Sequence, residues 1–315
     1  MRASGLFLLT GILVLVMAGS VQAQSVRPLR ILCIGAHPDD CDVKMGGTAA
    51  LYAAMGHQVK FLSVTNGDAG HYAQGGGVLA NRRRAEAEEA ARRLGIAEYE
   101  VLDNHDAELV PSLEVRKQII RKIREWQADL VFAPRPNDYH PDHRYTGQLV
   151  QDAAYLVMVP NVVPDTPPLA HNPVFLYLSD RFKKPNPFSP DIAVIIDSVV
   201  ERKLDALDAH VSQFYEWLPW IDGRLAEVPA DSAARREWLR AQWLRPNITQ
   251  EVRLALMRWY DPEVAARAQY VEAFEICEYG HQPPRTRSGC CFRCWENCRS
   301  IRKPGLPGAR SFCWE

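Results

Sequence analysis

Residues 30–40 read RILCIGAHPDD, and this stretch decides how the chain is expected to fold. Residues 29–34 are a short apolar run rich in β-forming side chains, and Gly35 ends the run, so the stretch predicts a strand. His37, Asp39 and Asp40 follow directly after it. Because ligands in open α/β sheets bind in the crevice beyond the carboxyl ends of the strands, these three side chains form a candidate site.

A second motif, HPDH at residues 140–143, repeats this arrangement. Residues 129–133 predict another strand, and Pro134, Pro136 and Asn137 end it before the motif begins. Catalytic zinc usually takes three protein ligands, drawn from His nitrogen and carboxylate oxygen, and keeps one position open. A His and an Asp of the first motif, with a His of the second, supply that set if the two strand ends face each other.

The two motifs, in this order, resemble those of the LmbE-like, or PIG-L, family of zinc-dependent N-deacetylases. The resemblance extends from about residue 30 to residue 280. Two metal-type motifs in the right order are specific, whereas the other matches are individually weak. Those other matches are TNGDAG at residues 65–70, Arg83 and Glu86 with Leu94-Gly95 in one helix pattern, and Lys203, Ala206, Leu207, His210, Ser212 and Gln213 in another.

The resemblance implies a role for each residue of the motifs. His37, Asp40 and His143 would be the zinc ligands. Asp39 would be the base that accepts a proton from the attacking water, and His140 would be an electrostatic or acid partner for the oxyanion. Two His and one Asp also suit iron(II) or cobalt, because the order of affinities does not decide which metal a site holds in the cell.

Each motif also has a plainer interpretation. Asp39 and Asp40 beside Pro38 could form a solvated turn, and His143 could lie on the exposed side of a helix start. The metal site is preferred because both motifs follow predicted strands and stand in the family's order. Asp142 is expected to hydrogen-bond, to cap the helix that begins near it, or to orient a ligand.

The chain departs from the family pattern near both motifs. Cys41 follows Asp40 where relatives commonly have Glu. Its thiol could compete for the metal, but a small buried hydrophobe is the preferred interpretation. Some relatives place a tyrosine two residues before the second motif, where this chain has Asp138, with Tyr139 next to His140. No catalytic tyrosine is therefore transferred.

Arg83 and Asp106 are the candidate substrate-binding residues. Each matches a family position that contacts substrate, and Asp106 would bind a sugar hydroxyl. The alternatives are an exposed ion pair between Arg83 and Glu86 and a turn role for Asp106. For His210 a functional and a structural or exposed role stay open. Tryptophans in the C-terminal third are more typical of a core than of a carbohydrate platform. They are Trp217, Trp220, Trp238, Trp243 and Trp259.

The rest of the chain alternates predicted strands and helices. Such repetition predicts an α/β fold, a single domain with a Rossmann-like, mostly parallel sheet and helices on both faces. A dinucleotide-binding protein is rejected because G-x-G-x-x-G does not follow the first strand. The further predicted strands are residues 58–64, 99–102, 173–178 and 191–196, and the predicted helices are residues 45–55, 81–94, 111–126 and 197–213, with one more that ends at residue 157.

Composition and the two ends of the chain define its expected setting. The chain has 315 residues, 47% of them hydrophobic, and a formal net charge of −1, which indicates a soluble globular enzyme. Basic residues alternate with acidic ones, so no nucleic-acid partner is expected. Residues 1–23 predict a signal peptide cleaved after Ala23, and hence a periplasmic or secreted protein. Their apolar run is too short for a permanent membrane anchor.

The C-terminal end differs in composition from the rest. Residues 283–315 are rich in Cys, Arg and Pro and show little periodicity, so we expect a disordered or aberrant tail after a deacetylase domain at residues 24–282. Cys291, Cys294 and Cys298 resemble zinc-ligand spacing, but no His pair or second CxxC completes the signature.

The expected function is a metal-dependent hydrolase that removes acetyl from an N-acetylated sugar or glycoconjugate of the N-acetylglucosamine type. The alternative is a metal-containing carbohydrate-binding module without hydrolysis. Asp39 favours the enzyme, because a structural zinc site fills all four positions and needs no spare carboxylate. No oligomeric state is predicted.

Overall fold

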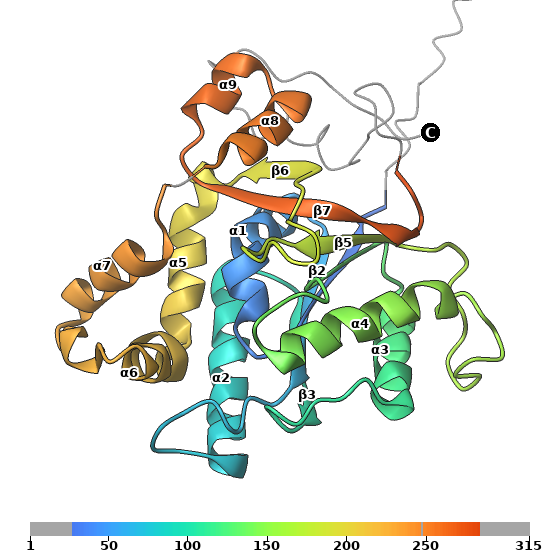
Figure 1. Ribbon diagram of the computed structural model, residues 1–315, viewed down its shortest axis with the longest axis horizontal. Coiled ribbons are helices and arrows are strands. Elements are labelled where there is room, and N and C mark those ends of the chain that lie inside the picture. The colour runs from blue at the N-terminus through green and yellow to red at the C-terminus, as the bar shows by residue number, and fades with distance from the viewer. Residues whose placement is uncertain (1–26, 247, 284–315) are drawn as a thin grey trace, which may run out of the picture.

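A seven-stranded sheet forms the centre of the molecule in the computed structural model, which describes residues 27–246 and 248–283 (Figure 1). The strands are β1 (Arg30–Gly35), β2 (Gln58–Thr65), β3 (Glu98–Asn104), β4 (Leu130–Ala133), β5 (Val174–Leu178), β6 (Ile192–Ile195) and β7 (Val271–Gly280). Their order is β3-β2-β1-β4-β5-β7-β6. The first five run parallel, and β7 is antiparallel to β5 and β6. The expected mostly parallel α/β fold is confirmed.

Helices cover both faces of the sheet (Figure 1). They are α1 (Asp40–Ala54), α2 (Gly76–Leu94), α3 (Leu113–Trp126), α4 (Pro141–Leu156), α5 (Val200–Ala209), α6 (Leu218–Ile221), α7 (Ser232–Trp243), α8 (Gln250–Trp259) and α9 (Pro262–Arg267). Ile31 and Cys33 of β1 pack with α1, α2 and α5, whereas Leu32 and Ile34 pack with α3 and α4. This alternation along β1 places one hydrophobic core on each side of the sheet.

Local sequence features explain where α3 begins and which of its faces is buried. Ser112 caps α3, since its side chain accepts a hydrogen bond from the backbone N–H of Val115. Ile119 and Ile123 then lie buried on the face of α3 that meets the sheet. The predicted helix at residues 111–126 is therefore confirmed almost in full.

Three helices differ from their predicted bounds, and one of them, α2, begins at Gly76 and not at residue 81. α1 begins at Asp40 and not at residue 45, and Asp40 and Asp42 lie in its first turn, where the positive end of the helix dipole favours their carboxylates. The helix predicted at residues 197–213 is interrupted. α5 ends at Ala209, His210 leaves helical geometry with ψ 63°, and a π-helical turn, Ser212–Trp217, follows.

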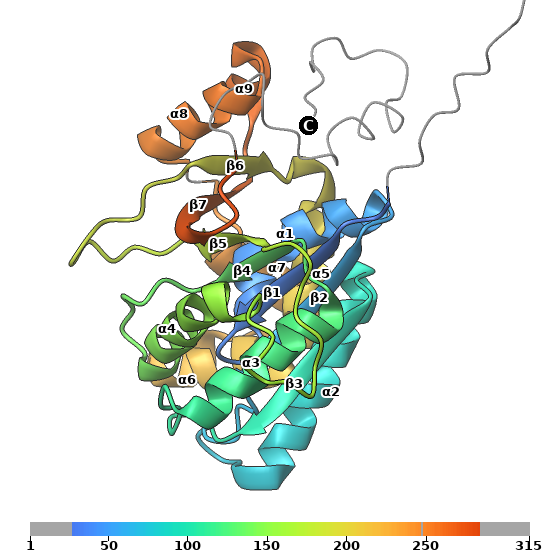
Figure 2. The same cartoon turned by 90° about the vertical axis from the view of Figure 1, so that its right-hand side faces the viewer.

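The C-terminal part contains elements that the sequence did not reveal. β7 and the helices α7 to α9 were not predicted, and β7 joins the sheet between β5 and β6 (Figure 2). Within the described residues, no helix combines the length and apolar character needed to cross a membrane. The predicted signal peptide and all of the predicted tail beyond Pro283 lie outside the described residues.

The site is positioned by the sheet order. From β1 the chain goes to β2 on one side, and it later returns to β4 on the other side of β1. The crevice opens where the order reverses in this way. At the end of β1, a Cβ on Gly35 would lie 2.7 Å from the Cβ of Asp40, so only glycine lets the first turn of α1 approach the strand this closely.

Candidate metal centre

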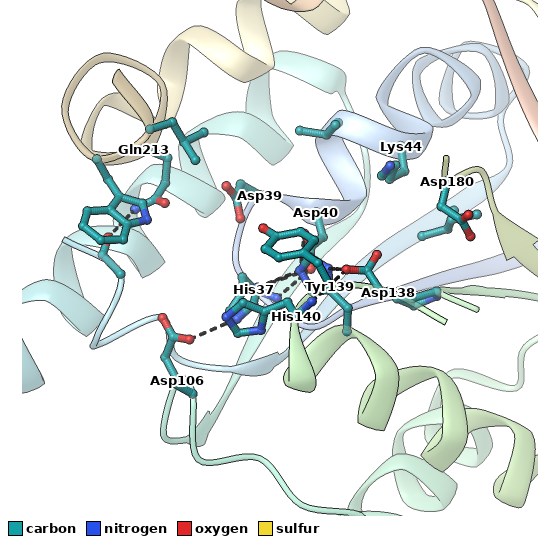
Figure 3. A pocket seen from close by; sticks show the side chains of 18 of the residues that line it. His37, Asp39, Asp40, Lys44, Asp106, Asp138, Tyr139, His140, Asp180 and Gln213 are labelled. Atoms are coloured by element: carbon teal, nitrogen blue, oxygen red, sulfur yellow. Dashed lines mark hydrogen bonds and ion pairs between the residues drawn. The ribbon is translucent and has the colours of Figure 1, made fainter. Parts of the chain in front are cut away.

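The two motifs meet at the carboxyl ends of β1 and β4 (Figure 3). His37 and Asp39 lie in the loop after β1, and Asp40 starts α1. His140 is the N-cap of α4, and His143 lies in its first turn. These five side chains line one cavity of about 720 Å³, a size typical of small-molecule sites.

The three predicted metal ligands converge on one point. His37 Nδ1 lies 3.1 Å from His143 Nε2 and 3.7 Å from Asp40 Oδ2. His143 Nε2 lies 3.4 Å from Asp40 Oδ1. Donor atoms bound to a tetrahedral zinc ion at about 2.1 Å are separated from one another by about 3.4 Å. Asp40 faces the two rings through different oxygens, Oδ2 towards His37 and Oδ1 towards His143, so the three side chains surround one point but do not present one donor atom each at these separations.

Asp40 is prepared to act as an anionic ligand. Its Oδ2 accepts hydrogen bonds from the backbone N–H groups of Ala36 and His37, at 2.8 and 2.9 Å. Burial by itself would raise the pKa of Asp40, but His143 and His37 outweigh it and hold the pKa well below its usual range. Oδ1 remains directed towards His143, as a metal ligand requires.

The opposite side of His37 is held by two other carboxylates. His37 Nε2 lies 3.0 Å from Asp106 Oδ1 and 3.3 Å from Asp142 Oδ2. Burial alone would lower the pKa of His37, but hydrogen bonds to Asp106 and Asp142 raise it to about 9. A carboxylate on the far nitrogen fixes the ring orientation and tautomer of a ligand His. Asp142 thus orients His37 and does not cap α4, since the capping side chain is His140.

Nearby His and Asp side chains offer further donor combinations. One donor atom from each of His37, His140 and His143 lies within 4.8 Å of the others. The same holds for the group His37, Asp106, His140 and Asp142. In the second group, Asp142 is already engaged, because its Oδ2 accepts from the backbone N–H of Ala107 at 2.7 Å.

Asp138 is a site residue that the sequence did not single out as functional. Its Oδ1 lies 3.0 Å from His143 Nδ1, so it orients His143 as Asp106 and Asp142 orient His37. Burial alone would lower the pKa of His143, but Asp40 and Asp138 raise it to about 10. A carboxylate two residues before the HPDH motif was the available signal, but only the fold shows that it faces the ring.

Asp39 has a different environment from its neighbour Asp40. Arg83 Nη2 lies 3.0 Å from Asp39 Oδ1, and the Arg83 side chain is buried. Burial raises the pKa of Asp39 above its ordinary value, although the Arg83 guanidinium opposes the shift. The alternative of an exposed Arg83–Glu86 pair is wrong, because Glu86 pairs with Arg82 and Arg83 with Asp39.

His140 faces the cavity with one defined tautomer. Its Nδ1 accepts a hydrogen bond from the backbone N–H of Asp142 at 3.2 Å, so the neutral ring carries its proton on Nε2. Burial lowers the pKa of His140, and the nearby His37 and His143 lower it further. The neutral ring still offers an Nε2–H donor to a developing negative charge in the cavity.

The remaining sequence candidates have defined places. Cys41 is fully buried, and its Sγ donates to the Cys33 carbonyl at 3.4 Å, which confirms the interpretation as a small buried side chain. His210 is also fully buried, with Nε2 3.1 Å from Asp42 Oδ2. Tyr139 is 72% exposed at the cavity rim.

Fold and site together define an α/β protein with a His/Asp metal-binding cluster at the carboxyl edge of a parallel sheet. Residues 32–154 match the PIG-L family, described as GlcNAc-PI de-N-acetylase. Over 207 residues the chain is 36% identical to the diacetylchitobiose deacetylase of Thermococcus kodakarensis, covering 61% of this chain and 74% of that protein. This chain therefore belongs to the PIG-L, or LmbE-like, family.

Further relatives agree with this membership. The chain is 28% identical over 231 residues to the probable N-acetyl-alpha-D-glucosaminyl L-malate deacetylase 2 of Bacillus anthracis, covering 69% of this chain and 95% of that protein. The structure of this chain matches that of N,N'-diacetylchitobiose deacetylase from Pyrococcus horikoshii with a TM-score of 0.58 and 31% identity. The match covers 78% of this chain and 83% of the other chain.

Proposed function

We propose that this chain is a metal-dependent hydrolase that removes the acetyl group from an N-acetylated sugar or glycoconjugate of the N-acetylglucosamine type. The observation that carries the proposal is the convergence of His37, Asp40 and His143 beside Asp39, a further carboxylate that the ion does not need. The deacetylase relatives support the same chemistry. A binding module without hydrolysis is not favoured, because it has no use for Asp39.

His37, Asp40 and His143 are the proposed ligands, and zinc is the proposed metal. Two His nitrogens and one carboxylate oxygen are the donors of many hydrolytic zinc sites, and iron(II) fits the same set. A zinc ion bound there supplies Lewis-acid activation of water and of the amide carbonyl. Asp106, Asp142 and Asp138 keep the two imidazole rings in the orientation that such an ion requires.

Asp39 and His140 carry the proposed proton and charge movements. Asp39 accepts a proton from the attacking water and later delivers it to the amine nitrogen as the C–N bond breaks, which yields acetate and the free amine. Burial raises its pKa above the ordinary value of a carboxyl, which favours its accepting a proton. His140 donates from Nε2–H to the oxyanion of the tetrahedral intermediate.

We revise the proposed roles of Arg83 and Asp106. Arg83 acts through Asp39, which it holds in place, because its guanidinium is buried against that carboxylate. Asp106 lines the cavity. Its Oδ2 faces Arg83 and lies 3.9 Å from Arg83 Nη1. We retain Asp106 as the proposed acceptor for a sugar hydroxyl.

Acetate release tests the proposed function. Metal-loaded protein should release acetate from N-acetylglucosamine derivatives, a chelator should abolish the release, and added zinc should restore it. If metal-loaded protein released no acetate from a broad panel of N-acetylated sugars and other amides, the binding-module alternative would replace the hydrolase.

We further propose export to the periplasm or the exterior. Support comes from the sequence of residues 1–23, with a basic start, an apolar stretch and small residues before the cleavage position. N-terminal sequencing of the mature protein from its native host should begin at Gln24. An N-terminus at Met1 would contradict export by cleavage.

A further inference from the structure

Two cations lie where the cavity of the metal cluster joins a smaller cavity. The smaller one has a volume of about 370 Å³, and we call it the side cavity. Lys44 and Arg181 line both cavities, so they lie at the junction between the two. In Figure 3, Lys44 and Asp106 lie on opposite sides of Asp40. The junction is therefore a distinct part of the site, away from the carboxylate proposed to bind a sugar hydroxyl.

Lys44 lies one helical turn after the proposed metal ligand Asp40. Both residues are in α1, and side chains four positions apart on a helix are neighbours on the same face. The Lys44 ammonium donates to the carbonyl of Ser179 at 2.9 Å, which positions the group but leaves its charge in place. Burial lowers the pKa of Lys44, although three carboxylates oppose the shift. An anion beside this ammonium would replace the hydration that burial removes.

The three carboxylates that act on Lys44 have other partners. They are Asp40, Asp138 and Asp180. Asp138 Oδ1 lies 3.0 Å from His143 Nδ1, and Asp180 accepts hydrogen bonds from Arg135 at 2.6 and 2.8 Å. Asp40 would be neutralised by the metal that it binds. Within the part of the chain that the structure describes, neither Lys44 nor Arg181 forms an ion pair with a carboxylate.

The side cavity has two further charged groups, and neither lies at the junction. Arg224 donates to Glu227 at 2.7 Å, so its charge is offset. Asp222 has no ion-pair partner among the described residues, and it lines the side cavity but not the first cavity. Its carboxylate would repel an anion from the deeper part of the side cavity. Attraction for an anion is therefore confined to the junction, where Lys44 and Arg181 lie.

Hydrolysis of an N-acetyl group yields two products of opposite charge. Water adds to the carbonyl carbon, the C–N bond breaks, and the nitrogen leaves with a proton as an amine. Near neutral pH the acid product loses its proton and the amine gains one, so the products are acetate and an ammonium-bearing sugar. The two cations at the junction attract the first of these products and repel the second.

We propose that the junction of the two cavities is an anion-binding position that receives the product acetate as it leaves the metal cluster. This inference rests on the proposed deacetylase function. Lys44 and Arg181 bind the carboxylate of acetate, and they are not assigned to the cleavage of the amide. The same charges keep the amino sugar out of the junction, so the two products are separated by charge.

Acetate binding to matched variants tests this position. Arg181→Met removes one cation from an exposed side chain at the junction. Lys183→Met removes the same charge two residues further along, from an exposed side chain that lines neither cavity. We would titrate isotope-labelled acetate by NMR into the chelator-treated full chain, where no metal competes for it. The Kd of acetate should rise about fivefold in Arg181→Met and stay unchanged in Lys183→Met.

Lys44 provides a second pair of variants. Lys44→Met should raise the Kd of acetate about tenfold, because its ammonium is less exposed than the Arg181 guanidinium. Lys44→Arg keeps the charge and should restore most of the affinity. The comparison of Arg181→Met with Lys183→Met changes only exposed side chains, so it decides the question even if Lys44→Met does not fold. Equal Kd values in that comparison, or no binding of acetate to the wild type, would overturn the assignment.

Inhibition of turnover separates this inference from the function on which it rests. In the metal-loaded protein, the inhibition constant of acetate should rise in Arg181→Met by the same factor as the Kd, and not in Lys183→Met. An active deacetylase with equal acetate inhibition in both variants would overturn the inference and leave the function intact. Acetate binding at the junction of a protein that hydrolyses no amide would overturn the function and leave the binding position.

A carboxylate carried by the substrate is the alternative source of the anion. Acetate release from N-acetylglucosamine and from N-acetylglucosaminyl malate distinguishes the two sources. We expect the ratio of the two kcat/KM values to be the same in Arg181→Met as in Lys183→Met. A loss in Arg181→Met that is confined to the malate conjugate, with acetate inhibition unchanged, would assign the junction to the substrate and overturn its role in binding the product.

Discussion

Two neighbouring carboxylates in the site differ because their surroundings differ. Asp40 accepts two backbone N–H groups and faces His143, and its pKa is held low. Asp39 is buried beside Arg83, and its pKa is raised. Pairs of acidic groups whose environments separate their pKa values commonly divide catalytic roles between them. That difference supports the proposed division, with Asp40 as a metal ligand and Asp39 as the proton-transfer group.

Replacement of Asp39 should separate these roles. Asp39→Asn keeps the size of the side chain and a hydrogen-bonding oxygen but cannot accept the proton. We expect kcat to fall by about 10²- to 10⁴-fold, with the metal content unchanged at one ion per chain. Acetate release and elemental analysis measure the two quantities. Loss of the metal together with activity would instead make Asp39 a ligand.

Asp138 should contribute to metal affinity without touching the ion. Asp138→Ala removes the carboxylate that orients His143 at 3.0 Å. We expect the metal Kd to rise about 10- to 100-fold, as measured by competition with a chromophoric chelator. Asp165→Ala is the control, since it removes a carboxylate paired with Arg121 at the exposed surface. Equal metal Kd values for both variants would exclude an orienting role.

The parts of the site that the sequence predicted are those carried by local patterns. The two motifs each follow an apolar strand, so their placement could be inferred from neighbours in the chain. The contacts Arg83–Asp39 and Asp106–His37 join distant segments, and no local pattern contains them. The structure places Arg83 in the cavity and pairs it with Asp39, a partner that the sequence did not reveal, and its contact with substrate stays a prediction.

Among the strands, those with a local apolar pattern were predicted, whereas a strand that depends on contacts with distant segments was missed. β1, β2 and β4 are apolar runs that the sequence displays directly. β7 was missed because charged residues interrupt it. One of them, Glu272, is buried, and it accepts hydrogen bonds from the N–H groups of Gly47 and Thr48 and from Lys203. These partners lie far away in the chain, so β7 could not be recognised as buried from its own residues.

The close approach of β1 and α1 should be sensitive to a single methyl group. Gly35→Ala would bring a Cβ within 2.7 Å of Asp40, and relief of that contact must move the first turn of α1. We expect a loss of about 1–3 kcal/mol in the free energy of unfolding, with weaker metal binding. Urea denaturation measures the first effect, and chelator competition measures the second.

Gly77→Ala is the matched control for this prediction. It lies in α2, where a new Cβ would meet no atom within 4 Å. We expect it to be neutral or to stabilise by up to about 1 kcal/mol, because alanine favours helix. Equal stability of the Gly35→Ala and Gly77→Ala variants would show that the approach at Gly35 can relax without cost.

The ion pairs that join β2, β3 and α3 through Glu100 should make the free energy of unfolding depend on pH. Glu100 Oε2 accepts from Lys60 at 2.5 Å, and Oε1 lies 2.7 Å from Lys122. Burial alone would raise the pKa of Glu100, but hydrogen bonds from Lys122 and Lys60 lower it below the ordinary value of a glutamate. A lowered folded-state pKa contributes stability above the unfolded-state pKa, and this stability is lost as the pH falls through the folded value.

Glu100→Gln should therefore destabilise the protein by about 1 kcal/mol at pH 7, and the difference should vanish as the pH falls through the lowered folded-state pKa of Glu100. Denaturant unfolding of both proteins across this range gives the comparison. Glu98→Gln is the control with a smaller expected effect, because Glu98 pairs with Lys60 alone and is 46% exposed. A difference between wild type and Glu100→Gln that is constant with pH would contradict the ion-pair origin.

At the scale of the whole molecule, one sheet and its two helical layers account for the described residues 27–246 and 248–283. We expect a chain truncated after Gln282 to keep full acetate release and an unchanged Tm, since the strand β7 that completes the sheet ends at Gly280. Kinetic assays and thermal denaturation of the truncated protein test this. Lost activity in a folded truncated protein would assign a function to residues 283–315.

His37 Nδ1 and His143 Nε2 lie 3.1 Å apart although 106 positions separate them in the sequence. An ion bound by both residues would link the loop after the first strand to a helix that is synthesised much later. It would stabilise the folded state, much as a disulfide that closes a long loop does. The supply of metal would then govern how much protein survives in the cell as well as how fast it works. Cells starved of the ion should accumulate less of this chain, even when its message is equally abundant.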